Sequence, residues 1–282
     1  MSIMTGQKYG NVKNLLEAVP PGFIVDSAWL EANGIGRRSV YDYVQQGWLE
    51  RLARGVFRRP VPGARASERI DWKSCVLSMQ HIMRYPVHLG GMTALALQGY
   101  SHYLALGDKA PVWLYGADVP NWLKKLPLDA PLKMRSRHLF TDPELGQAES
   151  RGEQRPDNTG SLPWDWALRM SAPERAALEA LDELPDHESF HNLDMAFEGL
   201  TTLRPKLLAS LLNDCRKIKV RRLFFVFADR HGHAWRKRLN PEDFDLGRGD
   251  RALVKGGRIH PRYRIVVPEA FAGAGNEGRD GT

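Results

Sequence analysis

A helix, a glycine-rich turn and a second helix near the N-terminus form the pattern that most limits how this chain can fold. The first helix is expected to be capped by Asp26 or Ser27 and to run to about residue 33. The second is expected over residues 37–46. Between them, Gly34-Ile35-Gly36 predicts a tight turn, because glycine adopts positive φ without steric cost. Two helices joined by such a turn are typical of a helix-turn-helix.

The flanking segments extend this pattern on both sides. Residues 11–19 have the apolar spacing of a short amphipathic helix, which the Pro-Pro-Gly sequence at residues 20–22 ends. After the helix pair, residues 49–52 and 56–59 predict two strands joined at Ala53-Arg54-Gly55. A β-hairpin in this position is the wing of a winged helix. The sequence therefore predicts a winged helix-turn-helix domain.

The second helix of the pair has two different faces. Val40 and Val44 are expected to pack on the other helices, with Trp48 beyond them. The other stripe carries guanidinium, phenol and amide groups, which hydrogen-bond base edges and phosphates in a major groove. The candidate DNA-binding residues of this helix and of the wing are Arg37, Arg38, Ser39, Tyr41, Asp42, Gln45, Arg51, Arg54, Arg58 and Arg59. A solvated helix face, or a winged helix that contacts only protein, remains the alternative.

The local charge favours double-stranded DNA as the partner. Residues 33–62 hold six arginines, no lysine and two acidic residues, a net charge of +4. Arginine binds phosphate oxygens or guanine through two parallel hydrogen bonds, which lysine cannot do. The whole chain has a net charge of +7 from 40 basic and 33 acidic residues, which agrees with a nucleic-acid partner without establishing one.

The rest of the chain predicts an α/β (α+β) protein with a second, larger domain. Residues 1–62 form the winged helix-turn-helix, residues 63–268 a larger mixed α/β domain, and residues 269–282 a glycine-rich disordered tail. Pro60-Val61-Pro62-Gly63 is the expected linker. The helices expected in the larger domain are residues 71–85, 94–98, 173–184, 190–200 and 205–215. The expected strands are residues 111–115, 132–135, 223–227 and 263–267, and a polar loop is expected at 149–160.

Charge is distributed unevenly along the second half of the chain. Residues 174–200 hold eight acidic residues against one arginine, whereas residues 216–264 hold fifteen basic residues against five acidic ones. The basic block either pairs with the acidic helices inside the fold or faces outward and adds phosphate contacts to the DNA surface. The candidate residues of such an accessory DNA or antitoxicity surface are Lys217, Lys219, Arg221, Arg222, Arg236, Lys237 and Arg238.

No motif predicts catalysis or metal binding. Gly90-Gly91 before a helix resembles the glycine pair of nucleotidyltransferases, but the acid pair Asp243 and Asp245 follows about 150 residues later, whereas it follows closely in those enzymes. His231 and His233 lack a third ligand at metal spacing. We therefore expect no catalytic residue, no metal and no cofactor, although an enzyme is not excluded.

The remaining composition is that of a cytoplasmic protein. The two cysteines, Cys75 and Cys215, are too few and too far apart for a disulfide framework or a zinc site, and we expect both to be reduced. No apolar run approaches the length of a membrane span, and residues 1–10 lack the apolar core of a signal peptide.

Several segments together resemble the AbiEi group, the antitoxins of type IV abortive-infection systems. The end of the predicted wing, Leu52-Ala-Arg-Gly-Val-Phe-Arg-Arg-Pro60, resembles the N-terminal domain of that group. The resemblance continues at residues 91–99 and is strongest at residues 171–179, 199–205 and 219–225. It spans roughly residues 10–268, and the order of the segments is what makes it specific.

The resemblance implies two activities. One is repression of the protein's own promoter at inverted repeats. The other is relief of the toxicity of a nucleotidyltransferase-like toxin without a stable complex, for which the larger domain is needed. Monomer and dimer both remain open, since pairing on DNA alone would suffice for a two-fold operator. The alternatives are a stand-alone winged-helix regulator without a toxin, a nucleotidyltransferase-like enzyme with a winged-helix targeting module, and a protein-interaction scaffold.

Overall fold

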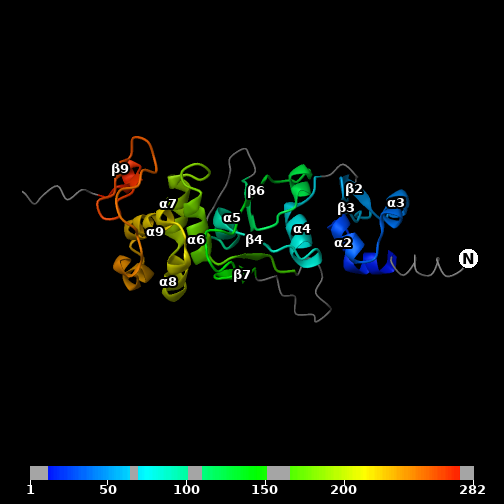
Figure 1. The fold of residues 1–282 in the computed structure, drawn as a ribbon, viewed down its shortest axis with the longest axis horizontal. Helices are drawn as coiled ribbons and strands as arrows, with labels where there is room; N and C mark the ends of the chain where they lie inside the picture. Colours follow the sequence, from blue (N-terminus) through cyan, green and yellow to red (C-terminus); the bar gives the residue numbers. More distant parts are fainter. Residues whose placement is uncertain (1–11, 64–68, 101–109, 151–165, 274–282) are drawn as a thin grey trace, which may run out of the picture. The chain divides into compact units, whose positions relative to one another are not determined.

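The computed structural model describes residues 12–63, 69–100, 110–150 and 166–273 of the chain. Helices and mixed sheets give it the predicted α/β class (Figure 1). The chain divides into two compact units. Unit 1 consists of Met1–His88, Lys109–Met134 and Glu149–Arg169, and unit 2 of Leu89–Asp108, Arg135–Ala148 and Met170–Thr282. The predicted domain boundary at residues 62 and 63 does not coincide with a boundary between these units.

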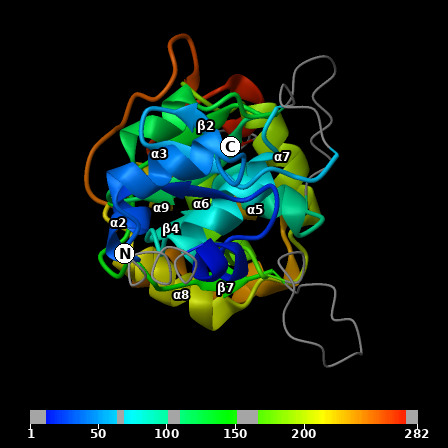
Figure 2. The same ribbon diagram turned by 90° about the vertical axis from the view of Figure 1, so that its right-hand side faces the viewer.

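Unit 1 begins with the predicted helices and hairpin. After a helix at residues 12–18 come β1 (Ile24–Asp26), α2 (Ser27–Ala32), α3 (Arg37–Gln45), β2 (Glu50–Ala53) and β3 (Val56–Arg58). The three strands form an antiparallel sheet in the order β1-β3-β2, with Phe57 opposite Val25 on one side and Arg51 on the other. Leu15, Leu30 and Val56 are buried in the core. The helices and the hairpin predicted in this part of the chain are confirmed, and α3 lies beside β2 (Figure 2).

A short helical segment and a series of strands follow along the chain. The predicted helix over residues 71–85 is α4 (Trp72–Leu77), which continues as the π-helix η1 (Ser78–Ile82). The strands and the 3-10 helix that follow are β4 (Val87–Leu89), β5 (Val112–Gly116), η2 (Asn121–Lys125), β6 (Leu132–Arg135), β7 (Gln147–Glu149) and β8 (Arg169–Ser171). They include a five-stranded sheet in the order β6-β5-β4-β8-β7, in which Leu89 of β4 lies parallel and opposite to Met170 of β8.

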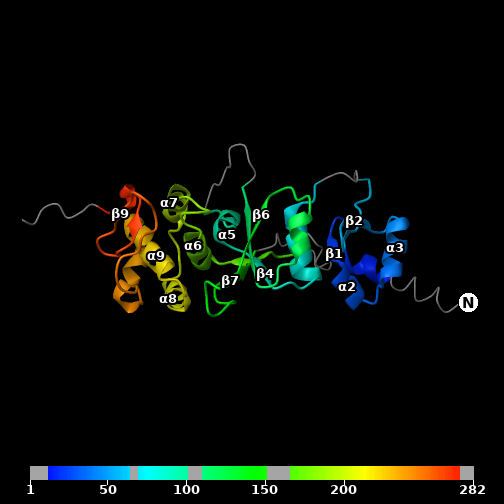
Figure 3. The same cartoon turned by 45° about the horizontal axis from the view of Figure 1, so that its top comes forward.

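Unit 2 is mainly helical. Its elements are α5 (Gly91–Leu97), α6 (Pro173–Asp182), α7 (Phe190–Gly199), α8 (Pro205–Asp214), α9 (Ile218–His231), η4 (Ala234–Arg238), η5 (Pro241–Asp243), β9 (Arg258–Ile259), β10 (Val266–Val267) and η6 (Glu269–Phe271). Helix α6 packs against α5, α7, α8 and α9, and the helices α6 to α9 lie together in Figure 3. The predicted helices 173–184, 190–200 and 205–215 are confirmed.

The predicted strand at residues 223–227 is wrong, because this segment is the middle of α9. Leu223, Phe224, Phe225, Val226 and Phe227 are all buried on a helix that α6, α7 and η6 surround. A helix that is covered on all sides is apolar all round, so its sequence lacks the helical spacing of apolar residues.

The chain after residue 262 also differs from its prediction. The expected strand at 263–267 is reduced to β10, which pairs antiparallel with β9, because Arg264 has a φ of 52° and interrupts the extended backbone. Within the tail that we expected to be disordered, Glu269–Phe271 forms η6. Phe271 packs against Phe190 and Phe227 at ring-centroid distances of 5.1 and 5.2 Å, which holds this segment in place. Residues 274–282 lie outside the described residues.

Candidate nucleic-acid interface

Helix α3 is positioned by contacts at both of its ends. At its start, the Ile35 amide donates to the Leu30 carbonyl at 2.9 Å and closes the turn between α2 and α3. At its end, the amides of Trp48 and Leu49 both donate to the carbonyl of Tyr43. Tyr43 is 1% exposed, and its ring lies 5.5 Å from that of Trp48. These contacts bury one face of α3 and leave the opposite face in solvent.

The exposed face of α3 carries the predicted base-reading side chains. Arg37, Arg38 and Gln45 are exposed, and Tyr41 is 63% exposed. Gly36 caps the helix and has no side chain to bind its first amides. The positive end of the helix dipole and two guanidinium groups therefore lie in the same turn, an arrangement that favours an anion such as a phosphate.

The β2–β3 hairpin presents further cations. Arg54 is exposed at the turn, next to Gly55, whose φ of 78° requires glycine. The Ser27 amide donates to the Gly55 carbonyl at 2.9 Å and ties the turn to the start of α2. Arg51 is exposed on the neighbouring strand, and its guanidinium lies 5.6 Å from the centre of the Phe57 ring.

Other predicted residues of this region make contacts inside the protein. Arg58 forms an ion pair with Glu50 at 2.7 Å, and its side chain is only 12% exposed. Arg59 donates to the carbonyls of Leu16 and Val19 at 2.5 and 2.8 Å, at the end of the helix at residues 12–18. Ser39 and Asp42 of α3 are half-buried. Of the ten predicted residues, the structure exposes six: Arg37, Arg38, Tyr41, Gln45, Arg51 and Arg54.

Five of the seven cations predicted as an accessory surface have contacts within unit 2. Lys217 pairs with Asp182 at 2.7 Å, and Lys219 donates to the Asp182 carbonyl at the same distance. Arg222 is 2% exposed and donates to three carbonyls, those of Leu246, Gly249 and Arg264.

The other members of that set divide into bound and exposed residues. Arg221 donates to the carbonyls of Asp245 and Cys215, and Arg236 pairs with Asp229 at 2.6 Å. Lys237 and Arg238, at the end of η4, are exposed. Sequence reasoning did not single out the exposed cations that follow η4 along the chain, which are Arg248, Arg251, Lys255, Arg258, Arg262 and Arg264.

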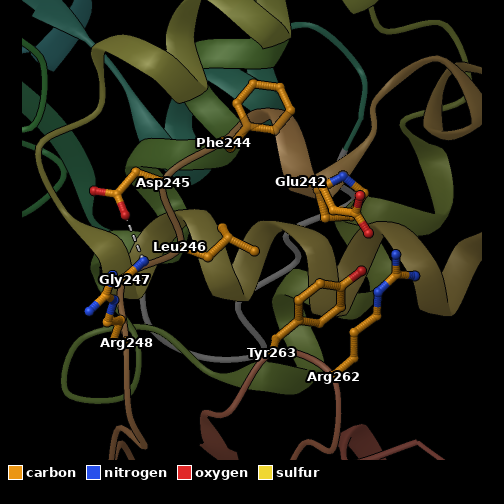
Figure 4. Close-up of a pocket in the computed structure, with 9 residues that line it drawn as sticks. Glu242, Phe244, Asp245, Leu246, Gly247, Arg248, Arg262 and Tyr263 are labelled. Carbon is orange, nitrogen blue, oxygen red and sulfur yellow. Dashed lines mark hydrogen bonds between the residues drawn. The ribbon is translucent and has the colours of Figure 1, made fainter.

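A cavity of about 480 Å³ lies in unit 2 between η5, the loop after it and Tyr263 (Figure 4). Its charged lining consists of Glu242, Asp245, Arg248 and Arg262, two carboxylates and two guanidinium groups. Burial raises the pKa of Tyr263 to about 12, and its hydroxyl donates to Asp229. Because the lining charges balance, the cavity does not indicate a ligand of one charge.

The glycine pair and the two histidines, which resemble parts of enzyme sites in the sequence, make contacts within the fold. The Gly91 amide donates to Glu179 at 3.1 Å, and so does the Ser171 hydroxyl, at 2.7 Å. His231 contacts Asp194, and His233 contacts the Phe197 carbonyl.

The described part of the chain holds neither a metal-binding cluster nor a membrane-spanning helix. No group of His, Cys, Asp or Glu side chains there is arranged to hold a metal ion. No helix there is long and apolar enough to cross a membrane. Both cysteines are buried and free, and burial raises the pKa of each thiol.

Comparison with protein families gives two adjacent matches that cover most of the chain. Residues 9–106 match the N-terminal domain of the transcriptional regulator AbiEi antitoxin, and residues 109–268 match the transcriptional regulator AbiEi antitoxin of type IV toxin–antitoxin systems. The chain belongs to the AbiEi antitoxin family. This membership confirms the resemblance drawn from the sequence and makes the protein a transcriptional regulator and antitoxin by family.

A solved structure shares the fold of this AbiEi family member. The crystal structure of the RV2827C protein from Mycobacterium tuberculosis superposes with a TM-score of 0.53, covering 90% of this chain and 89% of that one. The two sequences are 15% identical, so the likeness concerns the fold alone. The search of curated proteins gives no match.

Proposed function

We propose that this AbiEi family member represses its own promoter in the cytoplasm by binding inverted repeats through an N-terminal winged helix-turn-helix. The observation that carries the proposal is the exposed set Arg37, Arg38 and Tyr41 on α3, next to a hairpin that exposes Arg54. A helix of this size fits the major groove of B-DNA, and arginine is the commonest side chain in specific contacts to guanine.

The helix and the hairpin have separate roles in this proposal. Arg38, Tyr41 and Gln45 follow one another at helical spacing, so they lie along one stripe of α3 and read base edges. Arg54 at the hairpin turn and Arg51 on β2 contact phosphates and hold α3 in its register.

The family also supports an antitoxin role for the remainder of the chain. We propose that it counteracts a nucleotidyltransferase-like toxin without a stable complex. In unit 2, the exposed cations Lys237 and Arg238 are the members of the predicted accessory set that are free to meet DNA or another polyanion. An enzyme with a targeting module, and a regulator without a toxin, are the outcomes that the experiments below distinguish from this proposal.

Binding of the full chain to its own upstream region tests the DNA proposal. Arg38→Ala is expected to weaken specific binding by about 1–3 kcal/mol with less effect on random DNA, because it removes a base contact. Arg54→Ala is expected to weaken both alike and to reduce the slope of log K against log salt by about 0.9, because it removes one phosphate contact. Lys13→Ala is the control, since Lys13 is an exposed cation on the helix at residues 12–18. Equal binding by wild type, Arg38→Ala and Arg54→Ala at moderate salt would refute the assignment.

Co-expression with the adjacent open reading frame tests the antitoxin proposal. Growth arrest by that frame alone, relieved by this chain, is the expected result. Failure to relieve the arrest removes the antitoxin role and leaves the regulator. Transfer of a labelled nucleotide to RNA or protein by the purified chain with Mg²⁺ would instead favour the enzyme.

A further inference from the structure

A buried carboxylate at the start of α2 connects the helix pair to a later part of unit 1. Asp26 is 4% exposed. Its Oδ1 accepts from the Trp29 amide at 2.8 Å and caps α2. Its Oδ2 accepts from the Tyr85 hydroxyl at 2.5 Å and from the Trp122 indole at 3.2 Å. We call Asp26, Tyr85 and Trp122 the Asp26 junction.

The chemistry of the Asp26 junction makes it a strong contact. Hydrogen bonds to a carboxylate are stronger than neutral ones, and their partial burial strengthens them further. The rings of Tyr85 and Trp122 also meet edge to face, with centroids 6.4 Å apart. Burial raises the pKa of Tyr85 to about 12, together with the bond to Asp26, so the phenol stays a donor throughout the physiological range.

The backbone on both sides of the junction is shaped to make this contact. Ile24 of the edge strand β1 donates its amide to the Ser78 hydroxyl at 3.0 Å, in the π-helix η1. Arg84, immediately before Tyr85, has a φ of 61°, a conformation that a non-glycine residue adopts at a cost. Arg169 then donates to the Tyr85 carbonyl at 3.2 Å. A π-helix and a left-handed residue within one turn of each other are features that often mark functional positions.

We propose that the Asp26 junction positions the α2–α3 helix pair for operator binding by holding it at a fixed orientation on the rest of unit 1. This inference rests on the proposed DNA binding. Asp26, Tyr85 and Trp122 are positioning residues in it, because they act on DNA through α2 and α3. In this proposal, two copies bound at the inverted repeats also contact each other, through parts of the chain outside the helix pair. A helix pair that is held rigidly allows that contact at one spacing only. The wild-type chain should therefore prefer one spacing between the repeats.

The experiment compares the natural upstream region with the same DNA lengthened between the repeats by about five base pairs, half a helical turn. Wild type is expected to bind the natural spacing more tightly. Tyr85→Phe removes only the hydroxyl, and Asp26→Asn keeps an N-cap acceptor for α2 while placing an amide opposite two donors. In both variants, the ratio of the affinity for the natural DNA to the affinity for the lengthened DNA is expected to fall about fivefold or more. A change of this size is expected from the loss of a hydrogen bond to a charged group.

Tyr263→Phe is the matched control. Tyr263 also donates its hydroxyl to a carboxylate, that of Asp229, and its pKa is also raised to about 12, but it lies in unit 2. A general loss of stability lowers the active fraction equally for both DNA fragments and leaves the spacing preference unchanged.

The outcomes separate the inference from the proposed function. No operator binding by wild type would refute the DNA-binding proposal itself. Operator binding without a spacing preference in wild type, or an equal preference in wild type, Tyr85→Phe and Asp26→Asn, would overturn the inference alone. A loss of preference in Tyr263→Phe as well would also overturn it, because the preference would then not depend on the Asp26 junction in particular.

Discussion

Substitution of Glu179 by alanine should destabilise unit 2 more than any other single hydrogen-bonding change there. Glu179 and its partner Arg175 are each 1% exposed and form an ion pair at 2.8 Å within α6. Glu179 also accepts from the Gly91 amide and the Ser171 hydroxyl, so it joins the start of α5 and the end of β8 to α6. Its removal leaves these donors without their acceptor and a buried guanidinium without its counter-charge.

The loss of free energy of unfolding depends on which hydrogen-bond partners Arg175 keeps. Breaking a buried ion pair by removal of one member costs about 3–5 kcal/mol. Arg175 keeps two hydrogen bonds, to the carbonyls of Pro143 and Leu145, and its guanidinium lies 4.6 Å from the centre of the Phe140 ring. These contacts place the expected loss for Glu179→Ala near the lower end, at about 3 kcal/mol. Ser171→Ala removes one hydrogen bond donor and should cost about 1 kcal/mol.

Urea unfolding followed by far-ultraviolet circular dichroism measures these losses, with the slope m held as a check on two-state behaviour. The double substitution of Arg175→Met with Glu179→Leu is expected to recover only the part of the loss that comes from the unpaired charge of Arg175, because leucine at position 179 still offers no acceptor to the Gly91 amide and the Ser171 hydroxyl. A Glu179→Ala protein as stable as Ser171→Ala would refute the reasoning, because it would mean that the buried charge of Arg175 needs no counter-charge.

Three further predictions concern pH and an internal arginine. Burial alone would raise the pKa of Glu174, but the hydrogen bonds from Arg204 outweigh it and lower the pKa. The resulting stability is present above the ordinary value of 4.5 and is lost as pH falls through the lowered pKa, so Arg204→Ala should flatten the acid limb of a urea-midpoint profile. Burial and the bond to Asp229 raise the pKa of Tyr263 to about 12, which gives stability below the ordinary 10.0 that is lost as pH rises through 12. Asp229→Ala should lower this pKa, measured by tyrosinate absorbance. Arg59→Ala should lower the free energy of unfolding by about 1–2 kcal/mol, measured by urea unfolding. The substitution leaves the carbonyls of Leu16 and Val19, at the end of the helix at residues 12–18, without their donor.

The N-terminal elements were predictable because local signals agree with the tertiary structure. Asp26 caps α2 as its side-chain type suggests, and the positive φ of Gly34 and of Gly55 confirms both turns. The prediction missed Tyr43, which is more deeply buried than Val44. Residues three apart share a helix face as residues four apart do, so Val40 and Tyr43 also form a buried pair. The prediction considered only the spacing of four, from Val40 to Val44.

The second half of the chain was less predictable because its contacts join distant residues. Whether a basic residue pairs inside the fold or faces solvent depends on carboxylates that lie far away in sequence. Lys217 pairs with Asp182 and Arg230 pairs with Asp194, and the partners are at least 35 residues apart in sequence. The count of fifteen basic residues over 216–264 therefore overstated the charge that this segment presents to a partner.

The proposed DNA-binding surface also contains both arginines that are paired inside the fold and arginines that face solvent. A count of charges in the sequence does not separate the two kinds. Six arginines between residues 33 and 62 suggest six contacts to DNA, but the structure uses Arg58 and Arg59 to hold β2 and the first helix. Removal of Arg59 should therefore weaken DNA binding by disturbing the fold, with a loss of thermal stability, whereas removal of Arg38 should weaken it with none. Measured together, stability and affinity separate the arginines that contact DNA from those that support the surface on which the contacts are made.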